Sequence, residues 1–306
     1  MCGQPARLVI SKNLFGVPFW PPDTRRDVMT VERIAAFAKD GAGGNPAGVM
    51  LADALPSAAE MQAIAKEIGY SETVFAARQG AGWRVRYYAP EGEVPFCGHA
   101  TIALGAELGE RFGAGRYDLS LAQAEISVEA EQAANGWRAV LTSPPTRSQD
   151  LAPAVLVQVL ALFGWQAGDL DPAFPPLVAH AGADHAVLAL TDRAVLARMT
   201  YDFETGRALM AQQGWTTISL IQFAAPDRVN ARNAFAIGGV VEDAATGAAA
   251  AALAGAMVDR DWNGLSKGGR FVILQGEDMG SLSELLVEVT GVAGAGVRVA
   301  GAARRI

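Results

Sequence analysis

The sequence predicts a mixed α/β (α+β) fold that is built from two similar halves. The first observation is an internal repeat, in which residues 98–108 align with residues 243–253 and are identical at five positions. The second is an alternation of short apolar strands with helices along most of the chain. A repeat of this period usually marks one structural unit used twice. It implies two helix N-termini that face each other, although two alanine-rich helices can also resemble each other by chance.

The composition is that of a globular protein that does not bind nucleic acid. The 306 residues suffice for two domains of ordinary size, and 51% hydrophobic with 19% charged residues predicts packed cores. A net charge of −7 is the opposite of the basic surface that nucleic-acid binding requires. The longest apolar run, residues 248–258, is too short to span a membrane. We therefore expect neither nucleic acid nor membrane as a partner.

The cysteines and histidines predict neither a disulfide framework nor a metal site. Only Cys2 and Cys97 are present, and the histidines at positions 99, 180 and 185 lack the spacing of metal ligands. No charged and apolar leader opens the chain, so the sequence predicts a cytoplasmic protein. It also predicts that the protein works without a metal.

The first domain is expected over residues 29–145, joined by a C-terminal strand at about residues 290–306. Residues 1–28 contain several prolines and no sustained period, which predicts a poorly ordered N-terminal extension. Helices are expected at residues 57–69, where Ser57 and Glu60 form a capping box, and at residues 99–108. Strands are expected at residues 29–38, 49–51, 72–76, 83–88, 117–121, 125–130 and 137–141.

The second domain is expected over residues 150–289 and repeats this rhythm. Helices are expected at residues 153–163, from the capping Asp192 to about residue 199, at residues 204–212, and after Asp243. Strands are expected at residues 185–190, 216–223, 229–235, 270–275 and 284–289. Because many strands are short and close together in the sequence, many of their pairings should be antiparallel.

Glu72 is the first candidate for acid/base chemistry. It follows a helix-ending glycine, Gly69, and lies at the mouth of an apolar strand. Burial at that place would raise the pKa of the carboxyl group, so that it can take and return a proton near neutral pH. The alternative is a solvated glutamate at a strand end, which is the commoner fate of such a residue.

His99 and Asp243 are expected at the N-termini of the two repeated helices. The helix dipole there disfavours the imidazolium form, which would leave His99 as a neutral donor or acceptor. Asp243 matches Gly98 in the repeat, one residue before the counterpart of His99. Each side chain could instead cap its own helix, since Asp is among the best N-cap residues. For Asp243, a capping role and a place in the site are compatible.

Cys97 lies next to a helix start, where a thiolate could be stabilised. A two-cysteine racemase needs a second thiol on the opposite face of its substrate, but the corresponding place in the second half offers Glu242 and Asp243. The sequence therefore argues against a symmetrical two-thiol mechanism, and we interpret Cys97 as a packing or substrate-adjacent residue. The loop of residues 41–48 fits neither a dinucleotide fingerprint nor a P-loop, and no G-x-S-x-G motif is present.

Several motifs together resemble the phenazine-biosynthesis isomerase (PhzF-like) family. They are Phe37 followed by Gly44-Asn45-Pro46-Ala47-Gly48-Val49, Ser71-Glu72-Thr73-Val74-Phe75, residues 87–101 with Cys97-Gly98-His99-Ala100-Thr101, and residues 242–247 and 275–280. The resemblance covers the chain from Met29 onward. The Cys-Gly-His-Ala-Thr block with its acidic Pro-Glu-Gly-Glu lead is specific, so the chain is identified as a member of this family.

The resemblance implies the diaminopimelate-epimerase-like fold, with two pseudo-symmetric domains that each wrap a mostly antiparallel sheet around a central helix. It also implies cofactor-free isomerisation of a small carboxylate between the domains, usually in a homodimer. By matching position, Glu72 would move the proton, and His99 and Asp243 would assist. The substrate would be bound at the two helix N-termini, at Gly98, Ala100, Thr246, Gly247 and Ala248.

The chain departs from the family pattern at three places. Ala244 replaces the usual Pro after the Glu-Asp pair, and Ala248 replaces the usual Ser after Thr-Gly. Residues 232–236, with Asn233, replace an Arg-Phe-Phe-Ala-Pro strand. Losing the Ser hydroxyl removes a substrate hydrogen bond worth on the order of 1 kcal/mol. We therefore expect a remodelled pocket, which argues against the phenazine precursor as the substrate.

These observations give one leading hypothesis and two alternatives. The leading hypothesis is an isomerase in which Glu72 takes and returns a proton, while His99 and Asp243 stabilise the developing charge in an interdomain cleft. The first alternative is a racemase or epimerase that uses Glu72 and Asp243 from opposite faces of the substrate. The second is a small-ligand binding protein that keeps the fold without the reaction.

Overall fold

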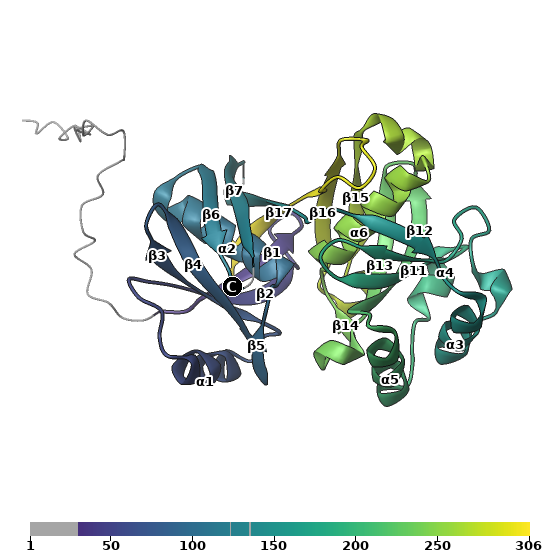
Figure 1. Ribbon diagram of the computed structural model, residues 1–306, viewed down its shortest axis with the longest axis horizontal. Helices are drawn as coiled ribbons and strands as arrows, with labels where there is room; N and C mark the ends of the chain where they lie inside the picture. The colour runs from purple at the N-terminus through teal and green to yellow at the C-terminus, as the bar shows by residue number, and fades with distance from the viewer. Residues whose placement is uncertain (1–29, 123, 135) are drawn as a thin grey trace, which may run out of the picture.

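The computed structural model describes residues 30–122, 124–134 and 136–306, and the extension expected at residues 1–28 lies outside them. Figure 1 shows two bodies side by side, each with strands around a helix, and a yellow C-terminal strand that runs from the second body into the first. The fold is mixed α+β with two pseudo-symmetric halves. This is the fold class that the repeat and the family resemblance predicted.

The first body is a closed ring of eight strands around one helix. Its elements are β1 (Glu32–Ala38), β2 (Asn45–Ala52), α1 (Ala58–Ile68), β3 (Thr73–Gln79), β4 (Gly82–Ala89), β5 (Gly92–Val94), α2 (Gly98–Phe112), β6 (Gly115–Ser120), β7 (Glu125–Ala133), β8 (Gly136–Thr142) and β17 (Arg298–Arg305). Hydrogen bonding orders the ring as β1–β2–β3–β4–β6–β7–β8–β17 and back to β1. Only β2–β3 and β4–β6 are parallel pairs within this ring.

The second body repeats this pairing pattern. Its elements are β9 (Arg147–Asp150), α3 (Pro153–Phe163), η1 (Ala167–Asp169), β10 (Leu177–His180), β11 (Asp184–Ala189), α4 (Arg193–Ala197), α5 (Phe203–Gln213), β12 (Thr217–Ala225), β13 (Arg228–Ala234), η2 (Ala236–Gly238), β14 (Glu242–Asp243), α6 (Gly247–Asp259), η3 (Trp262–Lys267), β15 (Gly269–Gln275), η4 (Glu277–Met279) and β16 (Ser283–Val289). The order is β9–β10–β11–β12–β13–β15–β16, with β11–β12 and β13–β15 parallel.

The helices α2 and α6 lie inside the two strand layers, and their sequences explain why. Every residue of α2 from His99 to Gly109 is buried, and nearly all of α6 is buried as well. A helix that is apolar and small on all sides is suited to burial within a sheet that curves around it. A Cβ at Gly105 would lie 2.5 Å from Val128, so the helix can approach the strands only because this residue has no side chain.

The local signals in the sequence are confirmed at several helix ends. Ser57 and Glu60 form the expected capping box of α1, and Gly69 ends the helix in the left-handed conformation. Asp192 caps α4 by accepting a hydrogen bond from the Val195 backbone. The short strands β5, β9, β10 and β14 were not expected, because two to four residues are too few to show an apolar period. The first strand begins at Glu32 rather than at Met29.

The repeat is real, but its predicted alignment is wrong by one helical turn. The helices begin at Gly98 and at Gly247, each four residues after the last residue of a short strand, Val94 or Asp243. The structural partner of Gly98 is therefore Gly247 and not Asp243. An alanine-rich helix matches itself almost as well after a shift of four residues, because such a shift preserves the buried face. The corrected alignment pairs Cys97 with Thr246 and His99 with Ala248.

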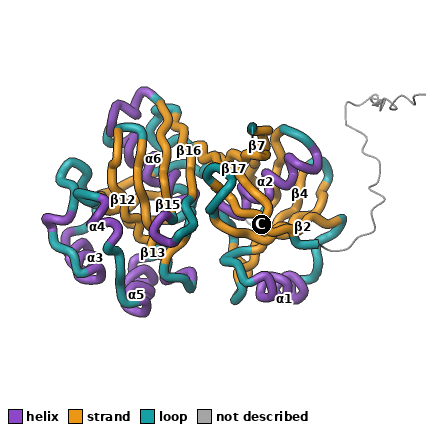
Figure 2. Tube along the Cα trace, turned by 180° about the vertical axis from the view of Figure 1, so that it is seen from behind, coloured by secondary structure: helices purple, strands orange, loops and turns teal. Residues whose placement is uncertain are grey.

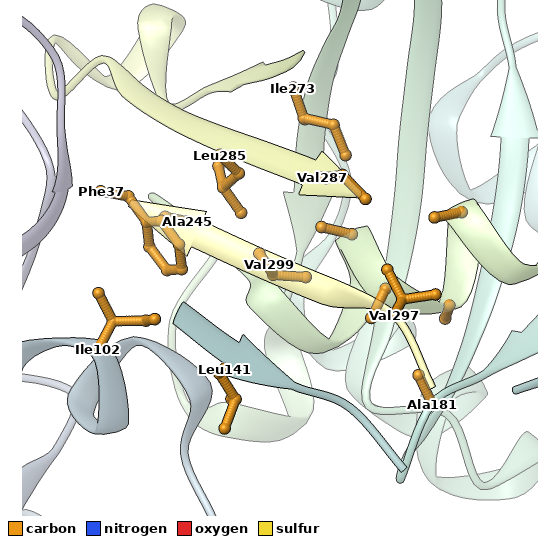
Figure 3. Close-up of a cluster of buried hydrophobic side chains, with 14 of the residues drawn as sticks. Phe37, Ile102, Leu141, Ala181, Ala245, Ile273, Leu285, Val287, Val297 and Val299 are labelled. Carbon is orange, nitrogen blue, oxygen red and sulfur yellow. The ribbon is translucent and has the colours of Figure 1, made fainter. Parts of the chain in front are cut away.

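One continuous apolar core connects the two bodies. It includes residues of β1, α2, α6, β16 and β17, and Figure 3 shows part of it, with Phe37, Ile102, Ala245 and Leu285 drawn together. The strands are also connected, since β16 pairs with β17 and contacts β1 at Ala38. Figure 2 shows β16 and β17 at the junction from behind. Among the described residues, no helix is long and apolar enough to cross a membrane.

Candidate active site

Glu72 lies at the end of the turn that follows α1, directly before β3. The residue is buried at 9% exposure, so the alternative of a solvated glutamate at a strand end is wrong. One carboxylate oxygen, Oε2, is buried without a hydrogen-bond partner among the described residues. This oxygen lies 3.4 Å from Nε2 of His99. A buried carboxylate oxygen without a hydrogen-bond donor lowers the stability of the folded protein, so its presence indicates a function.

His99 occupies the first turn of α2 and is also buried, with 5% exposure. Its Nδ1 lies 3.3 Å from Sγ of Cys97, and its Nε2 lies 3.4 Å from the hydroxyl of Ser71. The N-cap residue of α2 is Cys97, so His99 does not cap its own helix. The ring is instead held between the start of α2 and the strand entrance that carries Glu72.

Asp243 reaches the same region from the second half, on β14. Its Oδ1 accepts a 2.7 Å hydrogen bond from Asn45 Nδ2, and its Oδ2 accepts a 2.6 Å bond from the hydroxyl of Thr246. Burial raises the pKa of Asp243, and Glu72 acts in the same direction, while His99 opposes the rise. Glu72 and His99 are therefore near enough to Asp243 to affect the pKa of its carboxyl group. Asp243 does not cap α6, because the N-cap position belongs to Thr246.

Asn45 is the functional candidate that the sequence reasoning missed. It begins β2 in the first half and donates to Asp243 Oδ1 and, at 3.1 Å, to the carbonyl of Ala245 in the second half. The residue therefore fixes the carboxylate of Asp243 relative to the other body. In the sequence, Asn45 stands between glycine and proline and is typical of a turn, which concealed this role.

The N-termini of α2 and α6 face each other. A Cβ added at Gly98 would lie 3.8 Å from Cα of Gly247 and from the amide nitrogen of Ala248. The first helical hydrogen bonds are those from Thr101 N to Cys97 O and from Ala250 N to Thr246 O. The backbone N–H groups that precede them in each first turn therefore point out of the helix ends, toward the junction. Two such ends favour a bound anion.

The predicted substrate-binding residues all lie at the starts of α2 and α6, but one of them has its polar groups already hydrogen-bonded. Gly98 and Ala100 lie in the first turn of α2, and Gly247 and Ala248 lie in the first turn of α6. Thr246 differs, because its hydroxyl donates to Asp243 and its N–H donates to Oε1 of Gln275. The polar groups of Thr246 position Asp243 and the helix end rather than remaining available to a ligand.

Cys97 completes a compact group with Glu72 and His99, in which one ligand atom from each lies within 4.8 Å of the others. The sequence spacing did not predict this group, since Glu72 comes from a separate element. Burial, followed by the charge of Glu72, raises the pKa of Cys97 well above its ordinary value. A metal would require the thiolate, and the dipole of α2 disfavours a cation at this end. The group therefore fits a resident metal poorly.

The acid/base group is enclosed. Two surface hollows, of about 370 and 520 Å³, lie elsewhere; the first is lined by residues that include Trp137 and Arg305, the second by residues that include Arg270 and Arg298. Neither is lined by Glu72, His99 or Asp243. These three residues are themselves buried, at 9%, 5% and 8% exposure.

Comparison with known proteins agrees with this geometry. A family profile described as phenazine biosynthesis-like protein matches residues 34–305. The chain belongs to this family. An uncharacterised isomerase of Deinococcus radiodurans is 32% identical over 274 residues, which cover 84% of this chain and 85% of that protein. The trans-2,3-dihydro-3-hydroxyanthranilate isomerase of Pseudomonas fluorescens is 32% identical, with 84% and 89% covered. Membership thus places the chain in a family whose named relatives are isomerases.

Solved structures support the fold of this phenazine biosynthesis-like protein. A PhzF-family protein of Bacillus anthracis superposes with a TM-score of 0.79 at 23% identity, covering 90% of this chain and 96% of the other. A probable proline racemase of Agrobacterium radiobacter superposes with a TM-score of 0.61 at 12% identity, covering 90% of each chain. At these identities the two likenesses concern the fold alone, and the racemase likeness agrees with the epimerase-like architecture.

The expected departures from the family pattern all lie close to the site. Ala244 directly follows Asp243, and Ala248 is half-buried in the first turn of α6. Asn233 is almost fully buried on β13, where it pairs with Asp243 of β14. The three differences therefore surround Asp243, while the Glu72–His99 side of the site keeps the family motifs.

Proposed function

We propose that this protein is a cofactor-independent isomerase that moves a proton between carbons of a small carboxylate. The carboxylate of Glu72 takes a proton from a substrate carbon, and the electron pair left behind is delocalised toward the substrate carboxylate. The protonated Glu72 then returns the proton to another carbon of the same conjugated system. No oxidant, reductant or second substrate is required, and the product is an isomer.

The observation that carries this proposal is Oε2 of Glu72, which is buried, accepts no hydrogen bond from the described residues and lies 3.4 Å from Nε2 of His99. A proton-transferring group needs a lone pair that no other residue occupies. His99 would stabilise the charge on the substrate as it forms. Asp243, whose pKa is raised by burial, would act as a hydrogen-bonding or proton-holding partner from the other body.

The substrate carboxylate would bind between the two helix ends. The first-turn N–H groups of α2 and α6 converge where Gly98 approaches Gly247. Donors at this point would also stabilise the negative charge that moves onto the carboxylate when the proton leaves. Because Glu72, His99 and Asp243 are all less than 10% exposed, substrate entry would require the two bodies to separate and close again.

The racemase alternative receives less support from the same contacts. A two-base mechanism needs a free carboxylate on each face of the substrate. Both oxygens of Asp243 already accept hydrogen bonds, from Asn45 and from Thr246, whereas Glu72 Oε2 accepts none from the described residues. The arrangement therefore favours one proton-moving carboxylate over two. Deuterium uptake with inversion at one substrate carbon would support the racemase instead.

The experiment uses the substrate named for the Pseudomonas fluorescens relative, trans-2,3-dihydro-3-hydroxyanthranilate, in D₂O. If this compound is turned over, the product should be its isomer, and it carries deuterium only where Glu72 exchanges its proton with solvent before returning it. Glu72→Gln should lower the rate of isomerisation by about 10²- to 10⁴-fold while the fold is retained. Glu67→Gln, at an exposed position of α1, is the matched control and should keep the wild-type rate. Full activity of Glu72→Gln would show that another group moves the proton.

If the wild type does not turn over this compound, the same measurement on other small unsaturated carboxylates tests the proposal. The departures around Asp243 make such a result informative, because they would then account for a different substrate. Isomerisation of none of these carboxylates, together with tight binding of one, would favour the binding-protein alternative. A homodimer and a cytoplasmic location remain predictions from the sequence, and sedimentation analysis would measure the first.

A further inference from the structure

Phe37 has an unusual backbone conformation beside the proposed site. It is fully buried near the end of β1, with φ of +61°, a region that bulky residues rarely adopt. The register of β1 against β17 shifts between Ala36 and Ala38, so Phe37 is the extra residue of a β-bulge. Such strain persists only where the surroundings fix it, and it is found preferentially at functional sites.

The ring of Phe37 occupies space that Gly301 provides, and its far end faces Gly247. A Cβ on Gly301 of β17 would lie 2.2 Å from Cδ1 of the ring, so any other residue there would collide with it. At the other end of the ring, a Cβ on Gly247 would lie 3.5 Å from Cζ, which is ordinary contact. The ring therefore extends from the strand that closes the first body to the first residue of α6.

The neighbours of the ring come from both helix ends. Figure 3 shows the Phe37 ring directed toward Ile102, in the second turn of α2, and beside Ala245, which leads into α6. A Cβ added at Gly98 would lie 3.8 Å from Cα of Gly247, so the starts of the two helices are near each other there. A rigid planar side chain thus lies against the first residue of α6, at a place where the start of α2 is also near.

We propose that Phe37 is a positioning residue whose ring sets the separation of the α2 and α6 N-termini. The bulge turns the side chain out of the strand pattern and toward this junction. The length of the ring then fixes where Gly247 stands relative to Gly98, and where Asp243 stands relative to Glu72 and His99. The catalytic consequence rests on the proposed function, whereas the geometric claim does not.

The test compares three substitutions. Phe37→Leu shortens the side chain, Phe37→Met keeps most of its length, and Phe75→Leu makes the same change elsewhere. Phe75 is the matched control because it is equally buried but lies in a separate core cluster with Met50 and Met61. The amide resonances of Gly98 and Gly247 report the helix ends, and benzoate serves as a simple carboxylate probe.

Phe37→Leu should shift both glycine amides and weaken benzoate binding. With a substrate in hand, it should lower kcat/KM by about 10- to 100-fold, since displacements of about 1 Å have effects of this size. Phe37→Met should restore part of each loss. Phe75→Leu should lose thermal stability without any of these changes.

The proposal is overturned if Phe37→Leu resembles Phe75→Leu, with lower stability but wild-type amide shifts and benzoate affinity. If Phe37→Leu does not fold, Phe37→Tyr decides, because its hydroxyl lengthens the ring at Cζ, the end that faces Gly247. Wild-type amide shifts and benzoate affinity in Phe37→Tyr would overturn the proposal. If the helix ends are altered in Phe37→Leu but the wild type isomerises none of the tested carboxylates, the positioning role is sustained and the isomerase is refuted.

Discussion

The two bodies share a scaffold but differ in the chemistry they carry. In each body a helix, α1 or α5, ends at a glycine in the left-handed conformation, Gly69 or Gly214. Three positions after that glycine, the first body has Glu72 and the second has Thr217. Each central helix begins at a glycine. The residue after that glycine is His99 in one body and Ala248 in the other. At these two equivalent positions, the first body thus has acid/base groups and the second body has none.

A second comparison concerns an ion pair that occurs once in each body. Arg86 of β4 contacts Glu93 of β5 through two hydrogen bonds, and Arg232 of β13 contacts Glu242 of β14 in the same way. The first pair is partly exposed, at 25% and 36%, whereas the second is buried, at 11% and 5%. The two ion pairs therefore have the same geometry but differ in burial: one is partly exposed to water and the other is in the protein interior.

The comparison of helix starts predicts the largest effect on activity. His99→Gln should reduce turnover by about 10²- to 10⁴-fold, because it removes the group that stabilises charge beside Glu72. Ala248→Ser changes the equivalent position of the second body and should alter kcat/KM by no more than about tenfold, the value of one hydrogen bond. Steady-state kinetics on both variants measure the difference. Similar losses in both would mean that the two sides contribute equally.

The comparison of ion pairs predicts a large difference in stability. Arg232→Leu leaves Glu242 buried without its partner and should lower the free energy of unfolding by about 3–5 kcal/mol. Arg86→Leu leaves Glu93 partly solvated, so the loss should be about 0–1 kcal/mol. Urea unfolding of both variants gives the two values. Equal losses would show that the burial of the pair does not decide its contribution.

The smallest expected effect is a pH-dependent change in stability when Asp243 is replaced. Its pKa in the folded protein is raised, chiefly by burial, so the native state favours the protonated carboxyl group. That stabilisation is fully present below the ordinary pKa of 3.8 and is lost as the pH rises through the raised value. Asp243→Asn should therefore be more stable than the wild type at pH 7, by roughly 0.5–2 kcal/mol, the usual size of a single-residue effect.

The advantage of Asp243→Asn should shrink as the solution is acidified, and urea midpoints between pH 4 and pH 8 would follow it. Val94, at the equivalent position of the first body, carries no charge, and Val94→Ala should show no such pH dependence. A constant stability difference across the pH range would indicate that Asp243 is not protonated more readily in the folded state.

Much of the fold could be predicted from the sequence, because the residues that indicate each helix lie within it or at its ends. Capping residues, left-handed glycines and the repeated small-residue helices each act within a few positions, and they located α1, α4, α2 and α6. The helix alignment failed by one turn because residues 247–258 are so uniform that they do not distinguish one register from the next. The short strands β5 and β14, which fix the correct alignment, exist only through pairing with β4 and β13.

The individual residues of the candidate site could be predicted from the sequence, but the contacts between them could not. Glu72, His99 and Asp243 were recognised from their motifs, but their mutual contacts depend on strands that are distant in the sequence. The role of Asn45 could not be seen, because its hydrogen bond to Asp243 joins residues 198 positions apart. The positive φ of Phe37 was also unpredictable, since it arises from the bulge against β17.

The place of β17 has a consequence for how the protein is made. This strand completes the first ring between β1 and β8, yet it follows the whole second body in the chain. During synthesis the first ring must wait, with two open edges, until the second body has emerged from the ribosome. Such an edge can recruit strands of other chains. The newly made first half is therefore the species in which chaperone dependence and aggregation should concentrate.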